Sequence, residues 1–283
     1  MLGFLNINKP AGMTSHDVVA VLRRITHIKQ IGHTGTLDPF ATGVLPICIG
    51  KATRLLEYLK NDKTYIADVQ FGKNTDTYDC DGQISETFDK KIERSDLENI
   101  LPVFTGEIEQ LPPLYSAIKI NGKKLYEYAR KGEQVEVQPR KVMIYAIKLL
   151  DFNYDFQTAK LEISCKSGTY IRSLAFDIAQ KLGSGAFLTR LKRTKSDKFG
   201  IEKSLDLENL TLEKVQAKII NPVEILDIPR INVDNNDLNQ IKNGVQIIKP
   251  ATVDGLCTLV YNNKLCAIGE ACGNIISMKK VLL

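Results

Sequence analysis

The sequence predicts an α+β fold, with a large first domain and a small β-rich module at the end of the chain. Segments of strand and helix periodicity follow one another without the regular strand–helix–strand alternation of a doubly wound sheet. Two prolines, Pro222 and Pro229, bracket an expected linker. Beyond them, turn signals separate short apolar runs, as in a small barrel or sandwich. These turn signals lie at residues 243–244, 262–263 and 272–274. We therefore expect domains at residues 1–221 and 222–283.

The elements of the first domain follow from hydrophobic periodicity. Apolar and polar residues alternate over residues 3–8, which predicts a strand. Thr14 or Ser15 then caps a helix whose apolar positions have helical spacing. Residues 31–43 are rich in glycine and predict a loop. Further strands are expected at residues 44–49, 65–71, 142–150 and 159–165, and further helices at residues 52–59 and 170–182.

Two local motifs specify additional elements. Residues 95–98, Ser-Asp-Leu-Glu, have the pattern of a capping box and predict the start of another helix. Asn121 and Gly122 stand between two short runs of lysine and isoleucine, which predicts a tight hairpin turn.

Composition bounds the class of protein. Of 283 residues, 43% are hydrophobic and 25% are charged, a globular balance that excludes a disordered, collagenous or coiled-coil chain. The longest apolar stretch, residues 41–49, is far shorter than the roughly 20 residues that span a bilayer, so we expect no membrane association. The first residues show neither a basic leader nor the apolar core of a secretory signal, which predicts a cytoplasmic protein.

The six cysteines and three histidines do not predict a metal site. No two cysteines form a C-x-x-C pair, and the histidines do not cluster with them. A disulfide framework is not expected in a cytoplasmic chain of this size, so we expect most cysteines to be small buried side chains. The sequence thus predicts neither a metal nor a cofactor.

The net charge of +5 is concentrated in the first domain. Residues 222–283 hold six basic and six acidic side chains, so the excess lies before them. Residues 112–150 carry eight basic groups and three acidic ones, and a second basic run lies between Arg190 and Lys198. Such stripes suit a polyphosphate backbone, because each Lys or Arg neutralises one phosphate and releases counterions. They suit a solvated surface as well, so the charge pattern only favours a nucleic-acid partner.

The candidate segment for chemistry is Gly-His-Thr-Gly-Thr-Leu-Asp-Pro-Phe-Ala-Thr-Gly-Val-Leu at residues 32–45. Its three glycines allow unusual backbone angles and close approach of another molecule. Pro39 biases Asp38 toward an extended conformation, so Asp38 is a carboxylate on a constrained loop between a helix and a buried strand. These residues leave open whether Asp38 is catalytic or caps a turn. The chain has no GxxxxGK[ST] or GxGxxG motif, so nucleoside triphosphate hydrolysis has no support.

Four short motifs resemble those of one family, in its order and at its spacing. They are Asn-Lys-Pro-Ala-Gly-Met-Thr-Ser at residues 8–15, Gly-His-Thr-Gly-Thr-Leu-Asp-Pro at 32–39, Lys-Thr-Tyr at 63–65 and Gly-Thr-Tyr-Ile-Arg at 168–172. Over residues 3–220 the chain resembles the TruB family of bacterial tRNA pseudouridine-55 synthases, which shares its core with dyskerin-type synthases. The resemblance implies a catalytic domain with a mixed, mainly antiparallel sheet flanked by helices, and a PUA-like module after it. It also implies cofactor-free isomerisation of uridine 55 in the tRNA T-loop after base flipping.

The resemblance assigns roles residue by residue. It makes Asp38 the nucleophile, attacking C1′ or C6 of the uridine, and Arg172 the guanidinium that pairs with this carboxylate. Four other side chains are implied to contact the substrate. His33 holds the T-loop, Tyr65 stacks on the uracil, Tyr170 lies beside the base and Leu191 packs against it.

Residues 112–132 resemble the family's RNA-gripping insertion, the thumb, which we expect to extend to residue 141. A thumb explains the local positive excess better than a solvated face does. Contacts with the RNA backbone are expected from Lys119, Lys123, Lys124, Arg130, Lys192 and Arg193. The expected partner is the T-arm of tRNA, with no obligate protein partner and a monomeric chain.

Two departures and two alternatives remain open. Phe187 stands where the family often has histidine, and the module at residues 222–283 is short and neutral, so its contact with RNA stays open. One alternative is an RNA-binding chaperone that aids tRNA folding, and another is a synthase that modifies a different RNA. The presence of Asp38, Tyr65, Tyr170 and Arg172 together argues against a chaperone that has lost catalysis.

Overall fold

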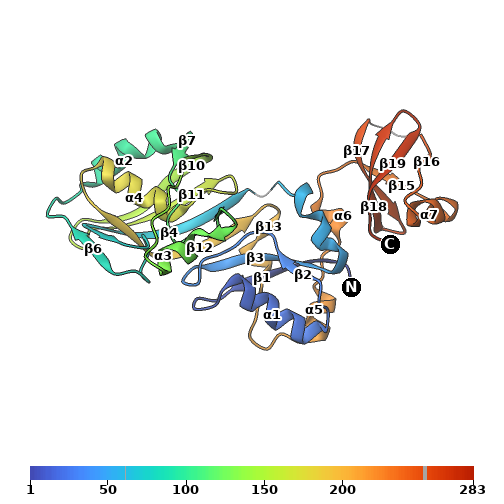
Figure 1. Ribbon diagram of the computed structural model, residues 1–283, viewed down its shortest axis with the longest axis horizontal. Helices are drawn as coiled ribbons and strands as arrows, with labels where there is room; N and C mark the ends of the chain where they lie inside the picture. The colour runs from blue at the N-terminus through green and yellow to red at the C-terminus, as the bar shows by residue number, and fades with distance from the viewer. Residues whose placement is uncertain (61, 251–253) are drawn as a thin grey trace.

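The computed structural model describes residues 1–60, 62–250 and 254–283. Within these ranges, ten strands form one large sheet (Figure 1). They are β1 (Gly3–Lys9), β2 (Ile31–His33), β3 (Thr42–Ile49), β4 (Lys63–Phe71), β7 (Gly106–Gln110), β10 (Arg140–Asn153), β11 (Thr158–Cys165), β12 (Ala186–Ser196), β13 (Phe199–Gly200) and β14 (Leu205–Asp206). The order is β14-β1-β3-β12-β4-β11-β10-β7, with β2 paired to β3 and β13 to β12. Only the pairs β1–β14 and β3–β12 are parallel, so the expected mixed, mainly antiparallel sheet is confirmed.

Helices cover one face of this sheet and bury the largest core. They are α1 (Ser15–Thr26), α2 (Arg94–Ile100), α4 (Ile171–Lys181) and α5 (Leu212–Ala217). α1 contacts β2 and α5, whereas α4 contacts β4 and β12, and residues of both helices belong to one hydrophobic cluster with residues of β1 and β3. None of the described helices is long and apolar enough to cross a membrane.

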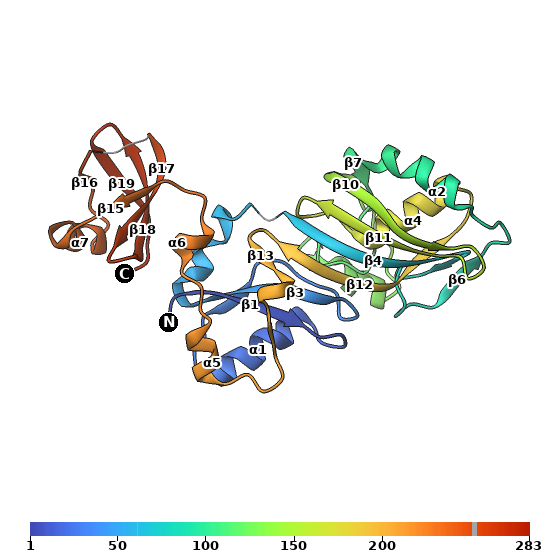
Figure 2. The ribbon, with the colours of Figure 1, turned by 180° about the vertical axis from the view of Figure 1, so that it is seen from behind.

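The opposite face of the sheet is covered over one half only. Phe4, Val44 and Cys48 point to this face and pack against the 3₁₀ helix η1 (Gly50–Tyr58) and the C-terminal part of the chain. Over the other half, the strands β4, β11 and β12 lie open (Figure 2). The alternating burial of β4 shows this, because its buried residues begin with Lys63 and Tyr65 and the residues between them are half-exposed.

The C-terminal part forms a second, five-stranded sheet with its own core. Its elements are β15 (Arg230–Asn232), α7 (Asn235–Lys242), β16 (Ile247–Ile248), β17 (Gly255–Tyr261), β18 (Lys264–Cys272) and β19 (Ile275–Val281). The order is β15-β17-β18-β19-β16. Asn262 and Asn263 have φ of 47° and 58°, as a two-residue hairpin turn requires. This sheet confirms the expected β-rich, PUA-like module.

The expected linker has a different structure. Residues 222–225 form the short helix α6 (Pro222–Ile225), and Val223 and Ile225 are buried. They belong to a cluster that joins Phe4 of β1 to Leu265 and Ile268 of β18. Arg54 of η1 also donates a hydrogen bond to the Val281 carbonyl at 2.8 Å. A shared apolar core thus crosses the predicted boundary between residues 221 and 222.

Several local predictions are confirmed and others need correction. Thr14 caps α1 and shares a capping box with Asp17. Asn121 and Gly122, with φ of 51° and 81°, form the hairpin turn between β8 (Lys119–Ile120) and β9 (Lys123–Lys124). The predicted helix at residues 52–59 is a 3₁₀ helix instead.

The capping box predicted at residues 95–98 is wrong. The helix α2 begins at Arg94, and the Asp96 carboxylate accepts from the N–H of Glu93 at 3.3 Å. Asp96 stands three residues after Glu93, so it reaches back to that N–H, and Ser95 lies inside the first turn. The basic run between Arg190 and Lys198 lies largely on the strand β12, where the buried Leu191 stands among the lysines and arginines.

Candidate active site

Asp38 lies on the loop of residues 34–41 between β2 and β3, here called the Asp38 loop. The side chain of Ser15, at the start of α1, accepts from the N–H of Leu37 at 2.8 Å and donates to the Leu37 carbonyl at 3.2 Å. Within the loop, the N–H of Ala41 donates to the carbonyl of Asp38 at 3.1 Å. Leu37 is buried in the main core. The residue before Asp38 is therefore fixed on both its backbone and its side chain.

Lys9, the last residue of β1, is hydrogen-bonded to the Asp38 loop at Pro39. Its ammonium donates to the carbonyls of Pro10, Met13 and Pro39 at 2.8, 2.6 and 3.1 Å. Lys9 is fully buried. Burial lowers its pKa to about 8, and the nearby charge of Asp38 opposes this change.

Asp38 pairs with Arg172 of α4 across the middle of the sheet. Nη2 of Arg172 donates to Oδ1 of Asp38 at 3.1 Å. Nε lies 3.0 Å from Oδ2, a charge contact that is off the line of a hydrogen bond. The Arg172 side chain is 4% exposed and that of Asp38 is 32% exposed. The carboxylate is held from the protein side and is open on the other, as a nucleophile requires.

Arg172 is itself fixed by a second carboxylate and by two carbonyls. Nη1 donates to the carbonyl of Thr77 at 2.9 Å and lies 3.3 Å from Oδ2 of Asp79. Nη2 also donates to the carbonyl of Tyr115 at 3.0 Å. The guanidinium is thus held on all sides, which sets the position of Asp38 through their shared contacts.

Asp79 was missed in the sequence analysis. It lies on a turn after the strand β5 (Lys73–Thr75), where its Oδ1 accepts from Oγ1 of Thr77 at 2.6 Å and from the N–H of Asp81 at 3.1 Å. Burial raises the pKa of Asp79, while the hydrogen bond from Thr77 and the charge of Arg172 oppose that rise. The available signal was the run of small polar residues at 74–82, which is typical of a structured turn.

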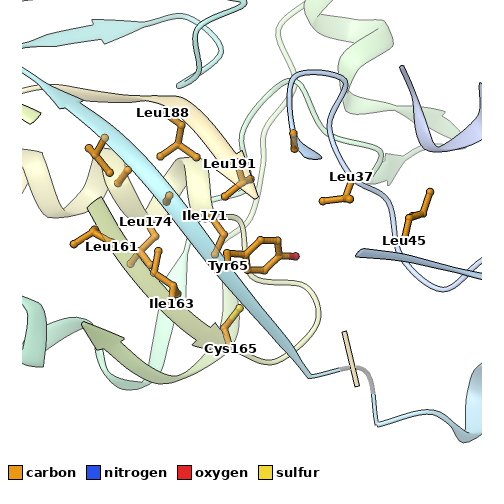
Figure 3. Close-up of a cluster of buried hydrophobic side chains, with 14 of the residues drawn as sticks. Leu37, Leu45, Tyr65, Leu161, Ile163, Cys165, Ile171, Leu174, Leu188 and Leu191 are labelled. Atoms are coloured by element: carbon orange, nitrogen blue, oxygen red, sulfur yellow. The ribbon is translucent and has the colours of Figure 1, made fainter. Parts of the chain in front are cut away.

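Tyr65 and Leu191 lie on the neighbouring strands β4 and β12 and are both 6% exposed. Figure 3 shows the Tyr65 ring extending from β4 toward the Asp38 loop, where Leu37 lies, with Leu191 close to it. Burial raises the pKa of the Tyr65 hydroxyl, the charge of Arg193 lowers it, and the charge of Asp38 adds to the rise. The ring is therefore a neutral, apolar wall beside the carboxylate.

Tyr170 immediately precedes α4 and is hydrogen-bonded to Gln110, the last residue of β7. Its N–H donates to Oε1 of Gln110 at 2.8 Å, and its carbonyl accepts from Nε2 of the same residue at 3.0 Å. Burial raises the pKa of the Tyr170 hydroxyl, the nearby Ser116 side chain opposes this rise, and the charge of Asp38 adds to it. The hydroxyl thus lies within the field of Asp38, next to the base of the thumb.

His33 ends the strand β2 and leads into the Asp38 loop. Burial lowers its pKa, and the charge of Arg193 lowers it further. Its Nδ1 is buried and has no hydrogen-bond partner among the described residues. His33 is therefore a neutral side chain at neutral pH, and it has no partner there that would make it an acid–base pair.

The thumb contains β8, β9 and the helix α3 (Leu125–Arg130), and three of its cations lie over tyrosine rings. Lys123 pairs with Glu133 at 2.5 Å and lies 4.1 Å from the centre of the Tyr128 ring. Lys124 and Arg130 lie 5.4 and 5.6 Å from the centre of the Tyr126 ring. Lys119 is exposed on β8. These four cations lie within one hairpin-and-helix segment, residues 119–130.

The structure places Arg193 differently from the sequence analysis, whereas RNA contact by Lys192 stays a prediction. Arg193 is fully buried, so it does not reach an RNA backbone, and this assignment is wrong. Lys192 is exposed, but it pairs with Ile66 and points to the open face of the sheet, away from Leu191. Because successive side chains of a strand face opposite ways, a basic run on one strand cannot form one surface.

The chain matches a family model described as TruB family pseudouridylate synthase (N terminal domain) over residues 23–171. It is 45% identical over 250 residues to the tRNA pseudouridine synthase B of Clostridium tetani (strain Massachusetts / E88). This alignment covers 87% of this chain and 86% of that protein. It is 42% identical over 283 residues to the protein of the same name from Caldanaerobacter subterraneus subsp. tengcongensis. This second alignment covers 99% of this chain and 98% of that protein.

A solved structure is similar over nearly the whole chain. The chain superimposes with a TM-score of 0.74 on a chain of the crystal structure of a Cbf5-Nop10-Gar1 complex, at 25% identity. The similarity covers 99% of this chain and 85% of that one. It includes both sheets, so the arrangement of the large domain and the small module is shared with that protein.

Proposed function

The chain belongs to the TruB family of pseudouridylate synthases, and we propose that it isomerises uridine 55 in the tRNA T-loop to pseudouridine with Asp38 as the nucleophile. The reaction breaks the bond between N1 and C1′ and forms a bond between C5 and C1′. N1 gains a proton and C5 loses one, so the substrate and product are isomers. A carboxylate that attacks C1′ or C6 keeps the reacting parts together while the base rotates.

The paired geometry of Asp38 and Arg172 is the observation that carries this proposal. Two contacts at 3.0 and 3.1 Å orient the carboxylate, and its 32% exposure leaves it accessible to a nucleotide. A uridine within a stacked loop cannot reach this position, so the base has to leave the stack. The fixed loop then holds the Asp38 carboxylate in the orientation needed for attack, so that the reaction of the bound uridine is effectively unimolecular.

Three further side chains fit a flipped pyrimidine. Tyr65 offers an aromatic face for stacking, and Leu191 lies on the adjacent strand as an apolar contact. Tyr170 lies in the field of Asp38 with its hydroxyl neutral, suitable for moving the proton that leaves C5. His33 enters as a neutral hydrogen-bonding group for the T-loop.

We assign the grip on the T-arm to the thumb. Its cations Lys119, Lys123, Lys124 and Arg130 lie on the segment whose Tyr115 carbonyl contacts Arg172, so RNA held there reaches Asp38. All proposed site groups come from one chain, which supports action as a monomer. A tRNA substrate also supports action in the cytoplasm.

The test maps pseudouridine in an unmodified tRNA transcript after treatment with the purified protein. The wild-type protein is expected to modify position 55 and to leave a transcript with cytidine at that position unmodified. Asp38→Asn has nearly the same shape but is a poor nucleophile, so we expect it to bind tRNA within about twofold of wild type and to form no pseudouridine. Arg24→Lys, an exposed change on α1, serves as the matched control.

Each other outcome has a clear meaning. Turnover by purified Asp38→Asn contradicts the nucleophile assignment. If the wild-type protein promotes tRNA folding without forming pseudouridine, it is a chaperone. If it modifies only a different RNA, the activity is retained and the substrate is wrong.

A further inference from the structure

Arg193 has the largest side chain among the fully buried residues of the described chain, and the proposed reaction gives it no role so far. It lies on β12, where it pairs with Tyr65 of β4 on one side and with Gly43 of β3 on the other. Gly43 has a φ of 102°, and a side chain there would collide with the Arg193 backbone at 2.2 Å. The strand that carries Arg193 is therefore packed directly against the strand that follows the Asp38 loop.

Each nitrogen of the Arg193 guanidinium donates to a different backbone carbonyl. Nε donates to Val44 of β3 at 2.7 Å. Nη2 donates to Gly35 at 3.1 Å and Nη1 to Thr36 at 3.4 Å, both in the Asp38 loop. The planar fork thus ties two successive residues of the loop to the sheet, a geometry that a lysine ammonium does not reproduce.

The charge of Arg193 has no carboxylate partner among the ion pairs of the described residues. A buried unpaired charge is costly, so its presence calls for a specific compensating use. The guanidinium lies near the Tyr65 hydroxyl and lowers its pKa, in opposition to burial. The Arg193 guanidinium therefore contacts the loop of the proposed nucleophile, and its residue lies opposite the proposed stacking residue, Tyr65, on the neighbouring strand.

Lys63 supports the same point of the loop from a second direction. It is 8% exposed, and its ammonium donates to Oγ of Ser167 at 3.1 Å. A Cβ on Gly35 would lie 2.8 Å from this ammonium, so the loop passes directly over it. Burial lowers the pKa of Lys63 to about 8, and the charge of Arg193 adds to this effect. Gly35 lies beside two buried cations, and a side chain there would displace the Lys63 ammonium.

We propose that Arg193 is a positioning residue that fixes Gly35 and Thr36, and through them Asp38, against β3 while it orients the Tyr65 ring. It makes no contact with the RNA backbone. The effect on turnover rests on the proposed function, because it acts through Asp38. The effect on the loop itself does not, because the hydrogen bonds exist in the free protein.

The kinetic test uses Arg193→Lys, which keeps the charge and loses the fork, and Arg193→Met, which removes the charge and avoids a buried ammonium. Both are expected to lower kcat about 10- to 100-fold, because the nucleophile is misplaced by a fraction of an ångström to an ångström. KM and the Kd for tRNA are expected to stay within about twofold of wild type, and the salt dependence of binding to stay unchanged. Arg24→Lys is the matched control, with no change in either quantity.

The opposite pattern overturns the proposal. If Arg193→Lys weakens tRNA binding, reduces its salt dependence and leaves kcat intact, Arg193 contacts phosphate. If kcat stays within twofold of wild type in both variants, the fork does not position the nucleophile.

Hydrogen–deuterium exchange of the free protein tests the same proposal without any activity. Amides of residues 34–41 are expected to exchange faster in both variants, while those of α7 and β18 stay at wild-type rates. Unchanged exchange in residues 34–41 overturns the proposal, even if the wild-type protein forms no pseudouridine. Wild-type protein that is inactive, combined with faster loop exchange in the variants, refutes the proposed function and keeps the positioning role.

Discussion

The Asp38 loop and the thumb are held to the protein in opposite ways. Buried side chains hold the loop. Ser15 hydrogen-bonds to the N–H and the carbonyl of Leu37. Lys9 and Arg193 donate to the carbonyls of Pro39 and Gly35, which lie on either side of Asp38 in the sequence. In the thumb, Lys123 pairs with Glu133 at exposed fractions of 25% and 45%, and such surface pairs contribute little stability. The contacts of the loop therefore fix one geometry, whereas those of the thumb allow its side chains to change position.

This difference matches what each region has to do. A nucleophile acts only within a narrow range of distances and angles, so its loop needs contacts that do not move. An RNA arm is bound through phosphates, whose attraction to lysine and arginine tolerates several arrangements. Because Arg172 bonds both Asp38 and the carbonyl of Tyr115 in the thumb, the two regions meet at one side chain. Variants of Arg172 should change turnover, and variants of the thumb lysines should change tRNA binding.

The largest effect is expected for Arg172→Met. This change removes the two-contact partner of Asp38 and leaves the buried carboxylate of Asp79 without its cation. We expect pseudouridine formation to fall by at least about 10³-fold, and Arg172→Lys, which keeps a charge but no fork, to fall by about 10²-fold. Single-turnover rates at saturating enzyme measure both, with thermal unfolding as the control for folding. Rates near wild type in either variant would show that Asp38 needs no oriented partner.

An intermediate effect is expected for charge reversal in the thumb, Lys123→Glu with Lys124→Glu. We expect the tRNA Kd to rise about 10- to 100-fold and the slope of log Kd against log salt to flatten by about 2, because two phosphate contacts are lost. A Kd measured across several salt concentrations checks this. Lys279→Glu with Lys280→Glu, on β19 of the C-terminal module, is the control for net charge. An equal loss in that control would assign the effect to total charge.

The smallest effect concerns stability and pH on the side of the molecule that holds the site. Burial raises the pKa of Asp177 on α4 to about 6. A raised carboxyl pKa means that the folded state holds the proton longer than the unfolded state, so stability is lost as pH rises from about 4 to about 6. Asp177→Asn should therefore be more stable than wild type at pH 7, by about 1 kcal/mol, and equal to it at pH 4.

Thermal or urea unfolding at the two pH values measures this difference. Glu133→Gln in the thumb is the comparison, because that carboxyl is exposed and its pKa is lowered by Lys123 instead of raised by burial. A gain in stability for Asp177→Asn that is the same at pH 4 and pH 7 would contradict the assignment to a buried charge.

The sequence predicts those elements whose patterns are local. The hairpin at Asn121 and Gly122 is correct because both residues favour the positive φ that the turn needs. The cap of α1 at Thr14 is correct for a similar reason, since Asp17 completes the box. The helix predicted at residues 52–59 is a 3₁₀ helix over Gly50–Tyr58, in which Ala52 and Leu55 are buried.

The arrangement of the site depends on contacts far apart in the chain. The pairing of Asp38 with Arg172 was expected only from resemblance, since 134 residues separate them, and it is present in the structure. Asp79 and the buried state of Arg193 could not be expected, because a charged residue in a sequence carries no sign of burial. Arg193 looked like its exposed neighbours, and only the pairing of β12 between β3 and β4 places it inside.

The central claim is that the Asp38 loop determines the rate of the chemical step and that the thumb determines tRNA binding. The most direct test measures the rate of pseudouridine formation as the enzyme concentration is raised to saturation. For Lys123→Glu with Lys124→Glu, we expect a higher half-saturating concentration and a plateau within about threefold of wild type. For Arg172→Met, we expect a plateau at least about 10³-fold lower at an unchanged half-saturating concentration. A plateau lost in the thumb variant and kept in Arg172→Met would contradict the separation of chemistry from binding.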